Sequence, residues 1–227
     1  MDKTLVLGGN SGIGQAVVNK LVEEYELNKP GEVLAPERLD VDVASYLDLQ
    51  SYLSKHGPFR YIVYSAGINV LEWIEDLTAT WASIAVNYMG FVNLISIHKS
   101  QYPDQQVSVV AVSSDAAEKP MRGSLAYCAS KAALDMAIRC AARELAPLWR
   151  VNGVAPGMVE GTAMTKYIDE EIPRFRNWSP EKALEYERSQ VPTGRRATLD
   201  EVSELICWIL LGPEQINGEI VRINGGR

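Results

Sequence analysis

The stretch Thr4–Val22, T-L-V-L-G-G-N-S-G-I-G-Q-A-V-V-N-K-L-V, decides the fold of this chain. It begins with a short apolar run and continues, after a glycine-rich turn, with apolar residues at helical spacing, which predicts strand, turn and helix. Gly8, Gly12 and Gly14 follow the spacing G-x-x-x-G-x-G. A turn without side chains lets backbone N–H groups and the start of a helix meet a pyrophosphate. The stretch therefore predicts a nucleotide-binding unit, and the alternative interpretation is a flexible loop.

The same alternation of strands and helices continues along all 227 residues, without a linker, an internal repeat or a low-complexity tract. It predicts an α/β fold with one doubly wound parallel sheet, in a single domain over 1–227. The expected later strands are 32–35, 60–66, 107–112, 150–155 and 219–223, and the expected helices are 46–53, 81–99, 125–145 and 199–211. Because Gly8, Gly67, Ser114 and Pro156 each follow a strand, we expect them to converge on one crevice.

The sheet is expected to be shortened near its second and third strands. Residues 32–35 and 39–43 both have strand-like patterns, but only Pro36, Glu37 and Arg38 lie between them. Parallel neighbours need a crossover of roughly a dozen residues or more. One of the two segments is therefore expected to be vestigial, or to form an irregular edge.

A second stretch, Val112–Lys131, carries the polar chemistry. Tyr127 and Lys131 are four positions apart on a predicted helix and so share one face, while Ser114 follows the strand-like run 107–112. A hydroxyl, a phenol and an ammonium that face one another can polarise a carbonyl and deliver a proton to it. Ser113 is the rival to Ser114, because adjacent strand residues point to opposite faces. Taken singly, Tyr127 and Lys131 would be an ordinary helical tyrosine and a solvated charge.

Composition excludes several classes of partner. The net charge is -7 and the pI is about 5.0, which disfavours nucleic acid and anionic membranes. Cys128, Cys140 and Cys207 have no metal-ligand spacing and are expected to be free, buried thiols in a reducing compartment. The sequence runs directly into a strand pattern, and its apolar run 205–211 is too short to span a bilayer, so we expect a cytoplasmic protein.

Taken together, these features resemble the short-chain dehydrogenase/reductase family over nearly the whole chain. The matching pieces, in order, are the Gly8–Gly14 turn, Asp42-Val43, Ser65-Ala66-Gly67, Asn87, Ser114, Tyr127-x-x-x-Lys131, Val151–Gly157, Pro192-x-Gly194-Arg195, Glu201-Val202 and Asn217-Gly218 through Gly225-Gly226. The departures are Leu7 before the turn, Ser65 in place of asparagine, one extra residue at Gly161, and the compressed region Pro30–Asp42.

The resemblance implies a Rossmann-type fold and hydride transfer between a nicotinamide cofactor and a ketone or secondary alcohol. Tyr127 would be the general acid in reduction, Ser114 would bond the substrate oxygen, and Lys131 would hold the nicotinamide ribose. Asn87 would position a water in a proton relay. Lys131 and the oxidised nicotinamide would lower the pKa of Tyr127 from its ordinary value of about 10. The implied cofactor contacts are Gly8, Asn10, Ser11, Gly12, Ile13, Gly14, Arg38, Asp42, Val43, Ser65, Ala66, Gly67, Tyr127, Lys131, Pro156, Gly157, Val159 and Thr162.

The choice of cofactor depends on Glu37 and Arg38. An acidic residue after the second strand usually binds the ribose 2′-hydroxyl of NAD, and a basic one the 2′-phosphate of NADP. We favour NADP, because family members that prefer it often carry an arginine here, and NAD is the alternative. Asp42 is expected to contact adenine rather than ribose.

The substrate is expected to lie against residues 118–122 and a lid or substrate loop at about 158–190, with one or two short helices. A ketone or alcohol of medium size fits, and no metal ligand set is present in the pattern. The family commonly pairs the helices around Asn87 and Tyr127, which implies a homodimer or homotetramer. Two other functions remain: a non-catalytic dinucleotide-binding regulator on the same fold, and a nucleotide-sugar epimerase or dehydratase, which usually needs a larger C-terminal region.

Overall fold

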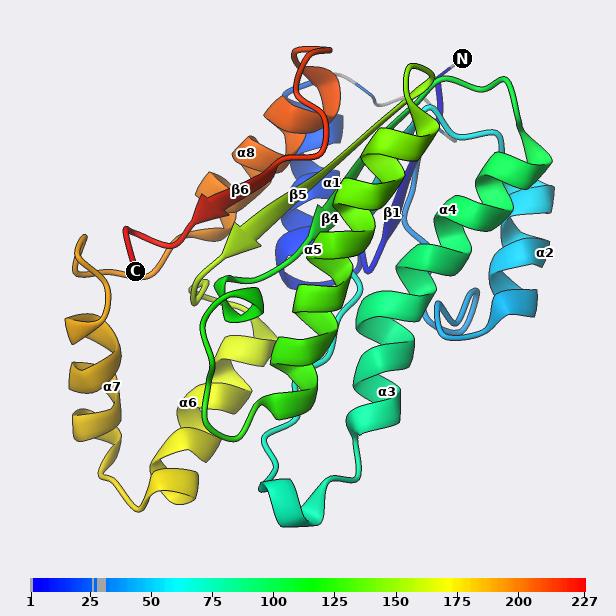
Figure 1. Ribbon diagram of the computed structural model, residues 1–227. Coiled ribbons are helices and arrows are strands. Elements are labelled where there is room, and N and C mark those ends of the chain that lie inside the picture. The colour runs from blue at the N-terminus through cyan, green and yellow to red at the C-terminus, as the bar shows by residue number, and fades with distance from the viewer. Residues whose placement is uncertain (1, 26, 28–31) are drawn as a thin grey trace.

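A computed structural model describes residues 2–25, 27 and 32–227, and shows one six-stranded parallel sheet with helices on both faces (Figure 1). The sheet order is β2-β1-β3-β4-β5-β6. The strands are β1 Thr4–Leu7, β2 Val33–Leu34, β3 Tyr61–Tyr64, β4 Val107–Val112, β5 Trp149–Pro156 and β6 Ile220–Ile223. The helices are α1 Gly12–Glu23, α2 Tyr46–His56, α3 Thr80–Ile84, α4 Gly90–Gln101, α5 Leu125–Leu145, α6 Ala163–Arg176, α7 Pro180–Ser189 and α8 Leu199–Leu211. The predicted doubly wound α/β fold is confirmed.

Alternate residues of each strand fill two hydrophobic layers, because successive side chains point to opposite faces of the sheet. On one face, α2, α4 and α5 pack on side chains such as Leu5 and Val109. On the other, α1 and α8 pack on Val6 and Val110. Both faces of the sheet are therefore covered, which is why the buried run 107–112 is apolar except for Ser108.

The sheet is shortened at one edge, as predicted, because β2 has only two residues and pairs with Thr4 and Leu5 of β1. The second strand-like segment, 39–43, is not a strand. It forms turns, with Val41 N donating to Glu37 O at 3.1 Å and Ser45 N to Asp42 O at 2.9 Å. The segment has a strand-like pattern of apolar residues because Val41 is buried in the core, with 3% of it exposed.

The predicted helix 81–99 is longer than expected and contains a π-helical turn, Ala85–Met89, between α3 and α4. By length and composition the run Thr80–Gln101 could cross a membrane. In the fold it packs instead: Phe91, Leu94 and Ile97 of this run are buried against the sheet and its neighbouring helices. About a third of its most apolar window, 33%, is buried, and a core helix of a packed domain passes the same test of length and hydropathy.

Two expectations need correction. The segment 158–190 is more regular than predicted, because it forms two full helices, α6 and α7, beyond the carboxyl ends of the strands (Figure 1). The three cysteines are free, but only Cys207 is buried. Cys140 is exposed, because it lies on the face of α5 that points away from the sheet, and Cys128 is half-buried.

Candidate active site

The predicted crevice is a cavity of about 470 Å³ at the carboxyl ends of β1, β3, β4 and β5. It lies beside β1 and β3, whose following helices, α1 and α4, cover opposite faces of the sheet. This is the usual ligand position in this architecture. Almost all of the predicted site residues line it: Gly8, Asn10, Ser11, Gly12, Ile13, Arg38, Asp42, Val43, Ser65, Ala66, Gly67, Ser114, Tyr127, Lys131, Pro156, Gly157, Val159 and Thr162. Gly14 and Asn87 are the predicted residues that do not.

The glycine turn is shaped for a close approach of backbone to ligand. Gly8 has φ +82, and a Cβ there would lie 2.7 Å from Ala66 N. A Cβ on Gly14 would lie 2.8 Å from the Gly8 carbonyl carbon, so Gly14 closes the turn rather than facing the cavity. At the start of α1, Ser11 makes no side-chain cap, which leaves the first N–H groups of the helix open to an anion.

The far end of the cavity is held by side-chain bonds to a short connection. Asn10 Nδ2 donates to Ala35 O at 3.2 Å and to Pro36 O at 2.9 Å. Arg38 lies at the rim with 85% of its side chain exposed, and its guanidinium is 3.6 Å from Asp42 Oδ2. Arg38 lines the cavity, and Glu37 does not. The side-chain amide of Asn10 therefore holds the loop that carries Arg38 in place.

Tyr127 and Lys131 lie on one face of α5, as their spacing predicts, and both are buried. The Lys131 ammonium is 5.8 Å from the centre of the Tyr127 ring and donates from Nζ to Val112 O at 2.7 Å. That bond ties the helix to the end of β4. A Cβ on Gly67 would lie 3.5 Å from Lys131 Nζ, so the glycine leaves room beside the ammonium.

Ser113 and Ser114 point to different partners, as adjacent strand residues should. Ser113 Oγ donates a short hydrogen bond to Asp135 of α5 and is buried. Ser114 Oγ accepts from Ala116 N at 3.2 Å and is hydrogen-bonded to Tyr127. Both serines line the cavity, but the hydroxyl of Ser113 is engaged with Asp135, which favours Ser114 as the residue that meets a substrate.

Burial sets the protonation of this pair. It raises the pKa of Tyr127 to about 12, against a smaller opposite effect of the hydrogen bond with Ser114. It lowers the pKa of Lys131 to about 8, and nearby Asp135 opposes this shift. In the protein alone the pKa of Tyr127 is therefore raised, because desolvation of the phenolate outweighs the hydrogen bond with Ser114 and the nearby Asp115 charge adds to the shift; the expected lowering by the bound nicotinamide stays a prediction.

Asn87 lies behind the cavity in the π-helical turn, fully buried, and all of its amide groups are used. Its Oδ1 accepts from Ile68 N at 2.8 Å, and its Nδ2 donates to Ile68 O and to Ser130 Oγ, both at 2.9 Å. Ser130 Oγ in turn donates to Tyr127 O at 2.8 Å. Asn87 therefore connects the loop after β3 to Ser130 of α5, the residue directly before Lys131.

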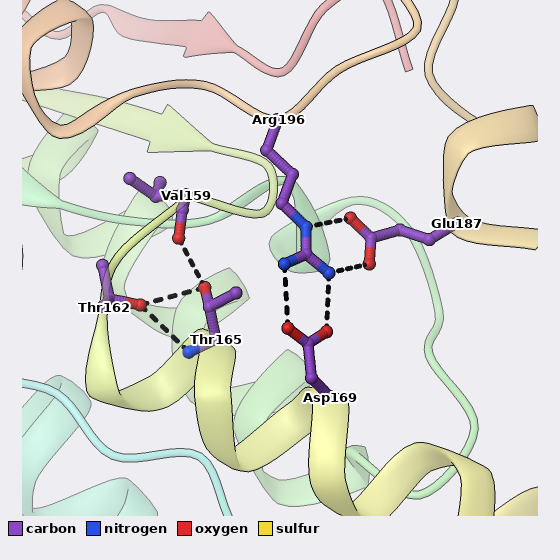
Figure 2. Close-up of polar contacts among 6 residues, drawn as sticks. All are labelled: Val159, Thr162, Thr165, Asp169, Glu187 and Arg196. Carbon is purple, nitrogen blue, oxygen red and sulfur yellow. Dashed lines mark hydrogen bonds and ion pairs between the residues drawn. The ribbon is translucent and has the colours of Figure 1, made fainter. Parts of the chain in front are cut away.

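The first turns of α6 line the cavity through Ala163, Met164 and Ile168, and Figure 2 shows the polar contacts of Thr162 and Thr165 at the start of this helix. Gly161, with φ +81, makes the turn that absorbs the extra residue before Thr162. Thr162 caps α6 through a bond from Thr165 N at 2.9 Å, and Thr165 Oγ1 donates to Val159 O at 2.6 Å. The start of the helix is thus fixed against the strand end.

Arg196 links helices α6 and α7 through ion pairs (Figure 2). It makes paired bonds to Asp169 of α6, at 2.6 and 2.8 Å, and to Glu187 of α7, at 2.5 and 2.7 Å. Its side chain is only 17% exposed, so the pairs are stronger than surface ion pairs. Neighbouring Arg195 instead bonds Glu201 of α8.

The substrate end differs from the prediction. Of residues 118–122, only Met121 lines the cavity, whereas Arg122 lies over the Trp73 ring at 4.8 Å. Trp73 in turn stacks on Phe175 of α6, with ring centroids 3.9 Å apart. Sequence reasoning missed Asp115 and Arg227, which also line the cavity. Asp115, next to Ser114, could have been noted as a charge at a buried strand end.

Three comparisons relate this chain to known proteins. Residues 12–227 match the family model described as Enoyl-(Acyl carrier protein) reductase. The acetoacetyl-CoA reductase of Synechocystis sp. is 31% identical over 99% of this chain and 95% of its own length. The 3-oxoacyl-(acyl-carrier-protein) reductase of Homo sapiens is 31% identical over 100% and 98%. A solved short chain dehydrogenase family protein from Francisella tularensis has a TM-score of 0.86 at 25% identity, covering 100% of this chain and 98% of that one.

Proposed function

This chain belongs to the short-chain dehydrogenase/reductase family and is an oxidoreductase, and we propose that it transfers hydride between a nicotinamide dinucleotide and a small ketone or secondary alcohol. The observation that carries the proposal is that the glycine turn opens onto the same cavity as Ser114, Tyr127 and Lys131. A nucleotide cradle and a proton donor in one cavity suit a carbonyl reduction.

Three features of the cavity fit a dinucleotide. Gly8 and Gly14 let the turn pack closely against Ala66 and against itself, and the open start of α1 suits a pyrophosphate. Gly67 leaves room beside Lys131 for a ribose. Arg38 at the rim supports NADP over NAD, since a guanidinium pairs with a 2′-phosphate. When bound, the nicotinamide supplies or accepts the hydride.

The side chains would act on the carbonyl oxygen of the substrate. Tyr127, with its pKa raised to about 12, keeps its proton through the neutral range and can donate it to that oxygen. Ser114 Oγ would donate a hydrogen bond to the same oxygen as charge develops there. Lys131 would hold the ribose and favour the phenolate left behind. General acid help of this kind is typically worth about 10²–10⁴-fold.

Asn87 would support the return of the proton. Its bonds to Ile68 and Ser130 hold the loop after β3 against α5, where a water can reach the Lys131 ammonium. Because its amide groups are all engaged in the fold, we propose that it acts by fixing this loop and the water that the loop binds. Asn87→Ala would then slow proton return more than it would weaken substrate binding.

The experiment that tests the proposed function follows nicotinamide absorbance over a panel of ketones and secondary alcohols. The wild type should turn over part of the panel, and Tyr127→Phe should lose about 10²-fold or more in kcat while still binding NADPH. Turnover that survives this substitution would refute the assigned mechanism. Binding of NADPH without any turnover by the wild type would instead favour the non-catalytic regulator.

A second experiment tests the cofactor. Arg38→Ala should weaken NADPH binding by about 10-fold and leave NADH binding unchanged, because one charge-assisted contact to a phosphate is worth about 1.5–3 kcal/mol at most and Arg38 is largely exposed. An unchanged preference in the variant would remove Arg38 from the site.

We also propose a homodimer or homotetramer that pairs α4 and α5. The helix run containing Asn87 and the helix containing Tyr127 leave apolar side chains such as Trp81, Met89 and Met136 exposed. Exposed apolar groups on adjoining helices are typical of an interface. Sedimentation should therefore show an oligomer, and Met136→Glu should weaken it.

A further inference from the structure

A buried carboxylate lies directly beside the proposed catalytic serine. Asp115 follows Ser114 in the short 3₁₀ turn Asp115–Ala117 after β4, is only 5% exposed, and lines the cavity. A charge buried to this degree is costly unless it is paired or bonded. Its surroundings therefore indicate what the cavity is built to receive.

The partners of Asp115 leave it incompletely satisfied. Arg227 Nη1 is 3.5 Å from Asp115 Oδ2, close enough for ion pairing. No side chain or backbone group in the described part of the chain makes a hydrogen bond to Oδ2. Nearby Asn224 donates its amide to Arg227 O at 3.0 Å. The carboxylate has a counter-ion and the side chain of Asn224 beside it, but its Oδ2 still lacks a close hydrogen-bond donor among the described residues.

Space is kept open on the cavity side of this pair. Gly157, at the end of β5, would carry a Cβ 3.6 Å from Asp115 Oδ2, so a side chain there would narrow the approach to the carboxylate. Arg227 also lines the cavity and is 22% exposed. Both charges thus border the volume that a substrate would fill.

The remaining wall at this end is apolar and adaptable. Met121, Met158, Met164 and Ile168 line it. Methionine side chains adjust to irregular shapes but offer no strong hydrogen bond. The corner formed by Asp115 and Arg227 can therefore bind a polar part of the substrate other than the reacting carbonyl, while Asn69 Oδ1 is a further, uncharged acceptor in the same cavity.

We propose that Asp115 and Arg227 form a subsite for a hydroxyl group of a polyhydroxylated ketone, or of the corresponding polyol. A hydroxyl donates to the carboxylate and accepts from the guanidinium, so it satisfies both groups at once. A carboxylated or phosphorylated substituent would face the charge of Asp115, an amine would face Arg227, and a plain ketone would offer Asp115 Oδ2 no hydrogen-bond donor. This inference rests on the proposed function and names its substrate class.

The test compares two ketones with the same four-carbon skeleton, erythrulose and 2-butanone. The wild type should prefer erythrulose in kcat/KM by at least about 10-fold, the value of one hydrogen bond to a charged group. Asp115→Asn should lower kcat/KM for erythrulose by about 10- to 100-fold, mainly through KM, and change that for 2-butanone by less than about threefold. Arg227→Gln should lower the same preference.

Glu118→Gln is the matched control. Glu118 lies three residues after Asp115, pairs with Arg222 on the surface and does not line the cavity, so its loss should leave both substrates unaffected. NADPH binding by each variant checks that it is folded. If Asp115→Asn does not fold, the wild-type preference and Arg227→Gln still decide.

The outcomes separate the two proposals. Equal or better turnover of 2-butanone by the wild type would overturn the subsite and leave the proposed function standing. A preference for erythrulose that persists in Asp115→Asn and Arg227→Gln would also overturn it. If the wild type reduces no ketone in the wider panel, both proposals fail together.

Discussion

Tyr64→Phe removes one buried oxygen and tests whether strand β3 fixes the helix that carries Asn87. Tyr64 is fully buried, and its hydroxyl donates to Val86 O at 2.5 Å. Val86 directly precedes Asn87 in the π-helical turn. The phenylalanine keeps the ring and its edge-on contact with Phe91, so the change is confined to this bond.

The magnitude follows from what the hydroxyl leaves behind. A buried carbonyl that loses its partner costs about 1–3 kcal/mol, so the free energy of unfolding should fall by that amount. Because the turn that carries Asn87 loses its anchor, kcat should fall about 10-fold, a part of the 10²–10⁴-fold that acid–base groups provide. KM should change little, since Tyr64 does not line the cavity.

Gly90 provides a second variant at the same contact. A Cβ on Gly90 would lie 2.8 Å from Val43 O and closer still to the Tyr64 hydroxyl. Gly90→Ala should therefore cost about 1–3 kcal/mol in the wild type and less in Tyr64→Phe, where part of the collision is gone. The coupling energy should be about 1–2 kcal/mol.

Urea unfolding at one fixed protein concentration measures these energies, and steady-state kinetics measures kcat and KM. Tyr61→Phe is the control, because Tyr61 lies on the same strand and its hydroxyl makes no hydrogen bond with the described residues. A loss below about 0.5 kcal/mol in Tyr64→Phe, or an equal cost of Gly90→Ala in both backgrounds, would refute the reasoning.

Three further predictions concern the lid, acid stability and the cofactor loop. Arg196→Met should raise substrate KM several-fold and expose α6 and α7 to proteolysis, because both helices lose their ion pairs, whereas Arg195→Met should do neither. Burial lowers the pKa of His98 from 6.5 to about 4, so the folded state holds this side chain neutral. The stability that depends on neutral His98 is therefore complete above pH 6.5 and is lost as the pH falls toward 4. Urea unfolding should show that the free energy of unfolding falls by about 2 kcal/mol between pH 7.5 and pH 5, and His98→Gln should remove this loss. Asn10→Ala should weaken NADPH binding more than NADH binding, and calorimetry should find its effect non-additive with Arg38→Ala, because Asn10 holds the loop that carries Arg38.

Local patterns predict the long elements well. The bounds of β4 and α5 coincide with the sequence prediction, because each has a strong period and a clear end, at Ser113 and at Pro147 respectively. The positions of Tyr127 and Lys131 on one face follow from helical geometry alone. These parts of the cavity are therefore readable from the sequence.

Contacts between distant segments are not readable in this way. The π-helical turn depends on Tyr64 and Gly90, which come from different elements and carry no local signal for it. Asp115 meets Arg227 only because β4 and the segment after β6 end at the same edge of the sheet. The raised pKa of Tyr127 likewise depends on burial by the whole fold.

The shortened edge of the sheet shows how a cofactor end can be built with little secondary structure. In place of a helix between strands, two bonds from Asn10 to Ala35 O and Pro36 O, and the buried plug Val41, hold the connection. These contacts fix the backbone and not the side chains, so Arg38 stays exposed, and only its ion pair with Asp42 would have to change for it to reach a phosphate. An exposed arginine loses side-chain conformational entropy when it binds a ligand, which weakens a geometrically exact contact. This edge should therefore recognise the 2′-phosphate by its charge more than by its shape. The affinity of the chain for NADPH should consequently depend on salt, while the contacts of the glycine turn should not.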